Sequence, residues 1–255
     1  MEALAVDILV VLKKSNGGLE FLARWAHVVA GITWIGILYY FNFVQVPAFA
    51  ELDPGARNQA VDKLASRALW WFRWAAVATL AMGLLILIVD PVNPMKIGDY
   101  WKTAEGVAIA TGILLAVTMF ANVWLVIWPA QKRVIANARN VLAGGEADPD
   151  AAAAGRKALL ASRQNTMFSF TMLFFMVGAA HFFGSAGFDV AKGSNRGIYW
   201  LITLVIWLFL ELNCLGVIGG TATGGINSIY DDHKRTIGVG LALVVVWYAL
   251  WVIIF

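Results

Sequence analysis

Residues 21–46 read FLARWAHVVAGITWIGILYYFNFVQV, an apolar run that is long enough to cross a lipid bilayer as one helix. Crossing the hydrocarbon core takes about 20 residues of helix. Further runs of this kind lie at about 68–90, 105–128, 166–184, 197–219 and 236–255. They are too long and too weakly alternating for barrel strands. The sequence therefore predicts an all-α fold, a polytopic membrane helix bundle with six transmembrane helices.

The composition supports one integral membrane domain that takes up residues 1–255. The chain is 60% hydrophobic and 14% charged, with a mean hydropathy of +0.73, which excludes an ordinary soluble domain. Residues 1–15 carry apolar residues together with Asp7, Lys13 and Lys14, and they are too short to span a bilayer. We expect them to form an amphipathic helix that lies in the membrane interface.

The distribution of Lys and Arg predicts how the bundle is oriented. Loops after the first, third and fifth spans hold eleven Lys and Arg residues, and the opposite side holds seven. Because positive charge favours the cytoplasmic side, both termini are expected outside, in the periplasm of a Gram-negative bacterium. The net charge of +3 belongs to this asymmetry, so no nucleic-acid partner is expected.

Two histidines lie inside the apolar runs, His27 early in the first span and His181 late in the fourth. The first and fourth spans run in opposite directions, so the two side chains are expected at the same depth. Ionisable residues inside a membrane are costly and usually functional. Two imidazoles at one depth suggest haem b, held without covalent attachment because no Cys-x-x-Cys-His motif is present. The alternative is that each histidine only bonds to a neighbouring helix.

Small and cationic residues near the histidines extend the predicted haem site. Gly31 shares the helix face of His27, and Gly178 lies one turn before His181. A glycine beside a ligand lets a flat macrocycle approach the backbone. Arg24, one turn from His27, could contact a haem propionate. The predicted cofactor-binding residues are His27, His181, Arg24, Gly31, Trp34 and Gly178, with the two histidines as ligands of the haem iron.

A second group of polar residues is expected in the other half of the bundle. Its members are Asn42, Asn122, Asn165, Glu211 and Asn213. They either pack helices together by interhelical hydrogen bonds or form a proton path or a small-molecule pocket. Glu211 as the proton carrier of a transporter is a weaker alternative, because the spans lack evident inverted halves.

Several ordered motifs resemble the PuuD-type membrane urate hydroxylases, that is, the urate oxidase N-terminal domain. The motifs are RWAHVVAGITWIG (24–36), ANVWLVIWPAQKRVIANAR (121–139), ADPD (147–150) and SRQNTMFSFTMLFFMVGAAHFF (162–183). The first helix is also similar to those of HemJ-type and CopD-type haem membrane proteins. The resemblance covers most of residues 20–185.

The resemblance implies a bacterial inner-membrane protein linked to the oxidation of urate to 5-hydroxyisourate. Members of the family carry a periplasmic cytochrome c domain after the last helix, whereas this chain ends at Phe255. The expected function is therefore a haem b-binding redox protein that passes electrons to a separate cytochrome c or respiratory partner. Whether it is itself a urate hydroxylase-type oxidoreductase stays open. The alternative is a non-catalytic or structural transmembrane subunit of a larger respiratory or photosynthetic complex.

Overall fold

The computed structural model describes residues 16–89 and 98–255, and in this part of the chain all regular structure is helical. The interfacial helix expected at residues 1–15 lies outside the described residues. The first two spans are built from α2 (Asn16–Tyr39), η1 (Tyr40–Gln45), α3 (Val46–Glu51), α4 (Pro54–Ala60), η2 (Val61–Ala65) and α5 (Ser66–Val89). The middle of the chain forms η3 (Tyr100–Lys102), α6 (Ala104–Ala121), η4 (Asn122–Ile127), α7 (Trp128–Leu142) and α8 (Ala151–His181). The last part forms α9 (Gly193–Cys214), η5 (Gly225–Asn227), α10 (Ser228–Asp231) and α11 (His233–Ile254).

Five helices within the described ranges are long and apolar enough to cross a membrane. They are Gly18–Glu51, Pro54–Val89, Ala104–Leu142, Gly193–Cys214 and His233–Ile254. The all-helical membrane fold is thus confirmed, but the number of six spans is not. The span expected at 166–184 corresponds to α8, which lies among the other helices and carries many buried polar residues. A helix surrounded by protein does not need the apolar surface that lipid demands.

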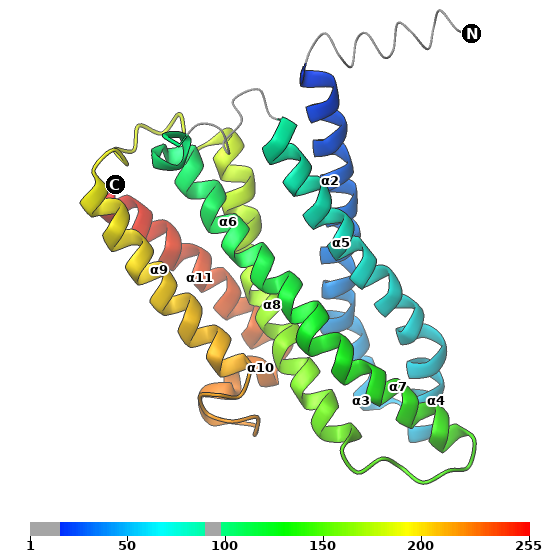
Figure 1. Cartoon of the computed structure of the whole chain (residues 1–255). Helices are drawn as coiled ribbons and strands as arrows, with labels where there is room; N and C mark the ends of the chain where they lie inside the picture. The colour runs from blue at the N-terminus through cyan, green and yellow to red at the C-terminus, as the bar shows by residue number, and fades with distance from the viewer. Residues whose placement is uncertain (1–15, 90–97) are drawn as a thin grey trace, which may run out of the picture.

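The bundle consists of a hairpin and a larger group of helices (Figure 1). The hairpin is α2 packed along α5, and the larger group has α6, α7 and α11 packed against α8, with α9 beside it. The hairpin meets the larger group where α4 and η2 contact α7, where α2 and η1 contact α8, and where α5 contacts α6 and η4. We call the end of the bundle with loops 52–53, 143–150 and 215–232 the loop end, and the opposite end the terminal end.

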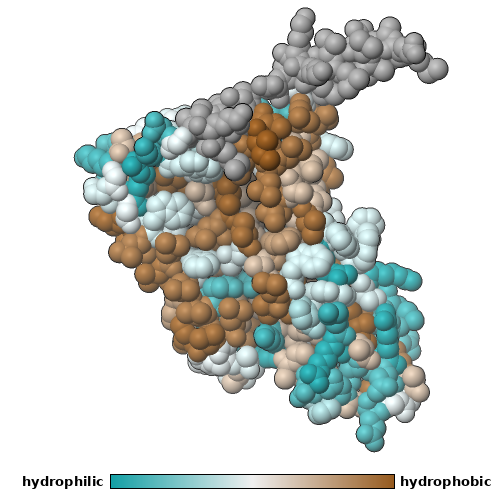
Figure 2. All heavy atoms as spheres, in the orientation of Figure 1, coloured by the Kyte–Doolittle hydropathy of each residue, from teal (hydrophilic) through white to brown (hydrophobic). Residues whose placement is uncertain are grey.

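Apolar and polar surfaces are separated along the bundle (Figure 2). Hydrophobic residues cover most of the visible face, and hydrophilic residues gather at the loop end, over α4, α7 and the start of α8. Ion pairs organise this end: Arg133 with Asp148 at 2.5 Å and Asp150 at 2.8 Å, and Arg139 with Asp62 at 2.5 Å. The polar extension indicates that α7 and α8 project beyond the apolar layer.

Capping residues explain where several helices begin. Asp53 accepts a hydrogen bond from Ala56 N at 3.0 Å, with Pro54 at the first helical position of α4. Thr103 accepts from Gly106 N at 3.1 Å and starts α6. Asp232 accepts from the backbone N–H groups at the start of α11. The caps at Thr103 and Asp232 place the helix starts a few residues before the apolar runs, whereas Asp53 starts a helix far before the run at 68–90.

Three π-helical segments interrupt the long helices, namely η1, η2 and η4. The apolar runs 21–46 and 105–128 predict continuous helices and give no sign of η1 or η4. A π segment inserts a residue into a turn and changes the direction of the following side chains, and such segments are frequent at functional sites. Here η1 contains Asn42, and η4 begins at Asn122.

Side-chain hydrogen bonds form a ladder between α9 and the continuous helix of α6 and η4. Its rungs are Thr111–Tyr199 at 2.9 Å, Trp207–Thr118 at 2.8 Å and Asn122–Glu211 at 3.3 Å. The large side chains of α9 therefore bridge the space between the two helices and fix how they are aligned along their length. Interhelical hydrogen bonds of this kind are common in membrane bundles.

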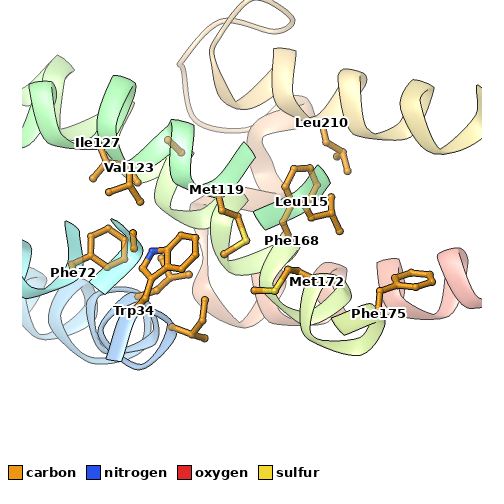
Figure 3. Packing of buried hydrophobic residues seen from close by; sticks show 14 of the residues in the cluster. Trp34, Phe72, Leu115, Met119, Val123, Ile127, Phe168, Met172, Phe175 and Leu210 are labelled. Atoms are coloured by element: carbon orange, nitrogen blue, oxygen red, sulfur yellow. The ribbon is translucent and has the colours of Figure 1, made fainter. Parts of the chain in front are cut away.

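The apolar core connects the hairpin with the larger group (Figure 3). Trp34 of α2 and Phe72 of α5 belong to one cluster with Met119 and Phe168, and all four side chains are almost fully buried. This cluster holds α8 at the centre of the bundle and so positions the polar residues described next.

Candidate functional site

In the central helix α8, polar side chains of the segment Ser162–Ser169 form hydrogen bonds with several neighbouring helices. Asn42 Nδ2 donates to Ser162 Oγ at 2.8 Å, and the hydroxyl of Tyr39 lies 2.8 Å from Ser169 Oγ. These contacts join α8 to the first span. They use the sequence SRQNTMFS, in which every polar position except Arg163 is uncharged.

The same segment reaches the last part of the chain. The hydroxyl of Tyr230 donates to Gln164 Oε1 at 2.7 Å, and Arg163 Nη1 lies 3.4 Å from Thr236 Oγ1. Arg163 is only 2% exposed, and no carboxylate within the described ranges lies within salt-bridge distance. Together with the contacts to the first span, these bonds make Ser162–Ser169 a polar hub, the name we use for this segment below.

Asn122 links the polar hub to α9. Its Nδ2 lies 3.1 Å from Asn165 Oδ1 and 3.3 Å from Glu211 Oε2, while Asn165 Nδ2 donates to the Met119 carbonyl at 2.9 Å. Glu211 is also hydrogen-bonded to Cys214. Three of the polar residues singled out in the sequence therefore form one network.

The other two members of the predicted polar group have different surroundings. Asn42 lies on the opposite side of α8 and joins the hub through Ser162. Asn213 does not join it: its Nδ2 donates to the Ile218 carbonyl at 3.0 Å and contacts Asn227 Oδ1 at 3.2 Å, which fastens the glycine-rich loop after α9. The sequence could not show which members of the predicted polar group join the hub and which hold a loop, because all five are expected in the same half of the bundle.

His27 is half-buried and faces α5. Its Nδ1 lies 2.8 Å from the carbonyl oxygen of Thr79, and Gly83 provides the space beside the ring. A carbonyl can only accept, so Nδ1 carries the proton and Nε2 keeps its lone pair. Histidines that ligate metals usually show this arrangement, with one nitrogen bonded to a carbonyl and the other free. The residues around His27 fit a haem ligand.

His181 is the last residue of α8 and is exposed. It lies at the same terminal end of the bundle as the first turns of α2 (Figure 1). The space beside Gly178 is filled by Phe183, because a Cβ on this glycine would lie 2.6 Å from the phenyl ring. The pairing of His27 with His181 stays a prediction.

The remaining residues of the predicted haem site lie along α2. Arg24 forms an ion pair with Glu20, one turn earlier on the same helix. Gly31 faces Thr79 on α5, and Trp34 is buried in the core with Nε1 unpartnered among the described residues. Within residues 16–89 and 98–255, no three His, Cys, Asp or Glu side chains cluster as a metal site. An iron held by haem needs only its axial ligands from the protein.

Several residues of the site were not identified from sequence: Tyr39, Thr79, Ser162, Ser169 and Tyr230. Thr79 acts through its backbone carbonyl, which no sequence pattern reveals. Ser162 and Ser169 lie within the motif SRQNTMFS, where the helical spacing of Ser162 and Ser169, seven residues apart, could have placed them on one face.

Comparison with known proteins finds a family match for the central part of the chain. The family described as Urate oxidase N-terminal matches residues 99–210, which cover α6, α7, α8 and most of α9. No curated protein and no solved structure matches the chain significantly. The first-helix motif at 24–36 lies outside the matched segment, and the likeness to HemJ-type and CopD-type proteins is not confirmed. Across residues 99–210, which hold Asn122, Asn165 and His181, the chain is similar to the urate oxidase N-terminal family, as its sequence motifs predict.

Proposed function

We propose that the protein is a haem b-binding redox protein of the urate-hydroxylase-like class in a bacterial inner membrane. It passes electrons to a separate cytochrome c or another respiratory partner. The proposal combines the match to the urate oxidase N-terminal family with the apolar spans, with His27 inside the first of them and with His181 at the end of α8. Both termini lie on the periplasmic side in this proposal.

The geometry of His27 is the observation that carries the proposal. A neutral imidazole that donates from Nδ1 keeps the lone pair of Nε2 for a second partner. His27 donates a hydrogen bond from Nδ1 to the Thr79 carbonyl, and its Nε2 has no hydrogen-bond partner in the described part of the chain. An imidazole fixed in this tautomer is ready to bind a metal.

The residues of this chain would hold and orient the cofactor. His27 would supply one nitrogen ligand to the iron, with the orientation of its ring fixed by the Thr79 carbonyl. His181 would supply another nitrogen ligand, and Arg24 would pair with a propionate. A bound haem b supplies reversible one-electron transfer at its iron.

Cations at the terminal end would receive an acidic electron-transfer partner. Lys192 is exposed there, and Lys102 pairs with Asp99 at 2.7 Å on the surface. Arg196 is less available, since its Nη1 donates to the carbonyls of Val190 and Ala191. Opposite charges at such a surface raise the rate of encounter more than the affinity.

The proposal is tested by the absorption spectrum of the protein purified in detergent. We expect a Soret band and the reduced-minus-oxidised bands of a b-type haem. His27→Ala and His181→Ala should each abolish or alter these bands, whereas His233→Ala in the loop after α10 should leave them unchanged. A haem-free protein after expression with excess haem precursor contradicts the proposal.

A further inference from the structure

A partly open cavity lies near the loop end, between the first two spans and the start of α8. Its volume is about 190 Å³, and its walls come from η1, α3, α5, η4, α7 and α8. Pockets for drug-sized ligands measure about 300–1,000 Å³, so this space suits a molecule of one ring. The cavity is remote from His27, which lies in the other half of α2.

The walls of the cavity are uncharged. Phe41 and Phe72 form an apolar side, with their rings in a T-shaped arrangement and their centroids 5.6 Å apart. The polar groups are Gln45, Gln131 and Ser162, each on a different helix. An ion would find no counter-charge in these walls, and burying an unpaired ion is very costly. The occupant must therefore be a neutral molecule with both a flat apolar face and polar edges.

Two carboxamide oxygens beside the cavity lack hydrogen-bond partners in the described residues. They are Oε1 of Gln45, which lines the cavity, and Oδ1 of Asn42, one turn earlier. Asn42 is 0% exposed, and its Nδ2 is already used by the Leu38 carbonyl and Ser162. Leaving buried acceptors unpaired carries a cost in free energy, because they lose their hydrogen bonds to water. A ligand with an N–H or O–H donor would satisfy Gln45 Oε1, the one of the two that lines the cavity.

Backbone geometry supports a built site at the same place. Asn42 and Gln45 belong to the π-helical segment η1, and the cavity residue Ile127 ends the π-helical segment η4. Regular α-helices would point these side chains in other directions. Two such interruptions at one small cavity are difficult to explain by packing alone, because each gives up regular hydrogen bonding.

We propose that this cavity binds a small, uncharged ring molecule that donates hydrogen bonds to Gln45 through N–H or O–H groups. The ring packs on Phe41 and Phe72, and its donor satisfies Gln45 Oε1. Cyclic ureas carry such N–H groups, and hydroquinones carry such O–H groups. The inference does not depend on haem, because no residue of the cavity belongs to the proposed haem site.

Binding is tested with pairs of probes that differ only in their donors. The whole 255-residue chain in detergent is titrated with 2-imidazolidinone and with hydroquinone, and saturation-transfer difference NMR reports binding. Their dimethylated forms, 1,3-dimethyl-2-imidazolidinone and 1,4-dimethoxybenzene, keep the ring and lose the donors. We expect saturable binding of at least one donor probe and much weaker binding of its dimethylated form. The probe that binds tells whether N–H or O–H donors are preferred.

Two variants place the binding in the cavity. Gln45→Leu removes the acceptor. It should lower the affinity for the probe about five- to tenfold, which is the effect of losing one hydrogen bond. Gly155→Leu fills the cavity and should abolish binding; a Cβ at Gly155 would meet only Val134, at 3.7 Å, so the helix tolerates it. Gly238→Leu, at a helical glycine with open space around it, is the matched control and should bind as wild type.

The proposal is overturned by any of three results. The first is that neither donor probe binds. The second is that the dimethylated probes bind as well as their parents. The third is that Gly155→Leu and Gln45→Leu bind the probe with the affinity of the wild type. A variant that fails to fold is recognised by its elution in gel filtration, and the other variant then decides.

Discussion

The Nδ1 atom of His27 lies 2.8 Å from the carbonyl oxygen of Thr79, so the imidazole of α2 is fixed by the backbone of α5. This bond sets which nitrogen carries the proton, and it fixes the orientation of the ring. Gly83, one turn after Thr79, leaves just enough room for the imidazole. The proposed haem site therefore depends on α5, although neither predicted ligand belongs to that helix.

Gly83→Val should disturb the haem without unfolding the bundle. A Cβ at this position would lie 3.1 Å from His27 Cε1, so a larger side chain must push the ring away from the Thr79 carbonyl. We expect weaker haem retention and a shifted midpoint potential, measured by redox titration of the absorption spectrum. Gly36→Val, where nothing lies within 4 Å of the added Cβ, should leave both unchanged.

Arg24→Gln tests the predicted propionate contact. Removing this cation from the terminal end should lower the midpoint potential of the haem, since a nearby positive charge favours the reduced iron. Lys157→Gln, at the loop end, is the control and should have no effect on the potential. Equal shifts from the two substitutions would show that the haem lies elsewhere or that the ends of the bundle are assigned wrongly.

Asn165→Ala should destabilise the bundle. The substitution removes the bonds to Asn122 and to the Met119 carbonyl from a fully buried position. The expected loss in the free energy of unfolding is about 1–3 kcal/mol, measured by denaturation in mixed micelles. Gln59→Ala, on the exposed face of α4, should change stability by less than about 0.5 kcal/mol. Unchanged stability in Asn165→Ala would mean that the hub does not hold the helices together.

Acid should release the loop between α7 and α8. The Arg133 guanidinium, with the Asp150 N–H as a second donor, holds the pKa of the Asp148 carboxyl below its ordinary value of 3.8. Because the folded pKa is the lower one, the contribution of this contact is present above pH 3.8 and is lost as the pH falls through the folded pKa. Hydrogen exchange of residues 143–150 should thus stay slow from neutral pH down to that range.

The Asp148→Asn variant should behave differently. Its loop should exchange faster at every pH and show no acid transition of its own. A loop in the wild-type protein that opens near neutral pH would contradict the assignment of the Arg133–Asp148 contact.

The apolar runs predict the class of fold because lipid imposes a simple requirement on every helix that faces it. The same rule fails for α8, whose neighbours are protein, so its polar segment Arg163–Asn165 separates it from the five apolar spans. Asn122, Asn165 and Glu211 were predicted as a group, since polar residues inside spans seek one another. The π-helical segments and the Thr79 carbonyl could not be predicted, because backbone geometry leaves no mark in hydropathy.

The central claim is tested most directly by electron paramagnetic resonance of the oxidised protein purified with its haem. Two axial imidazoles give a low-spin ferric signal, and our account predicts this signal in the wild type. The account also predicts its loss in His27→Ala, with recovery when free imidazole is added to fill the vacated position. A preparation without haem iron, or a low-spin signal that persists unchanged in His27→Ala, would contradict the account.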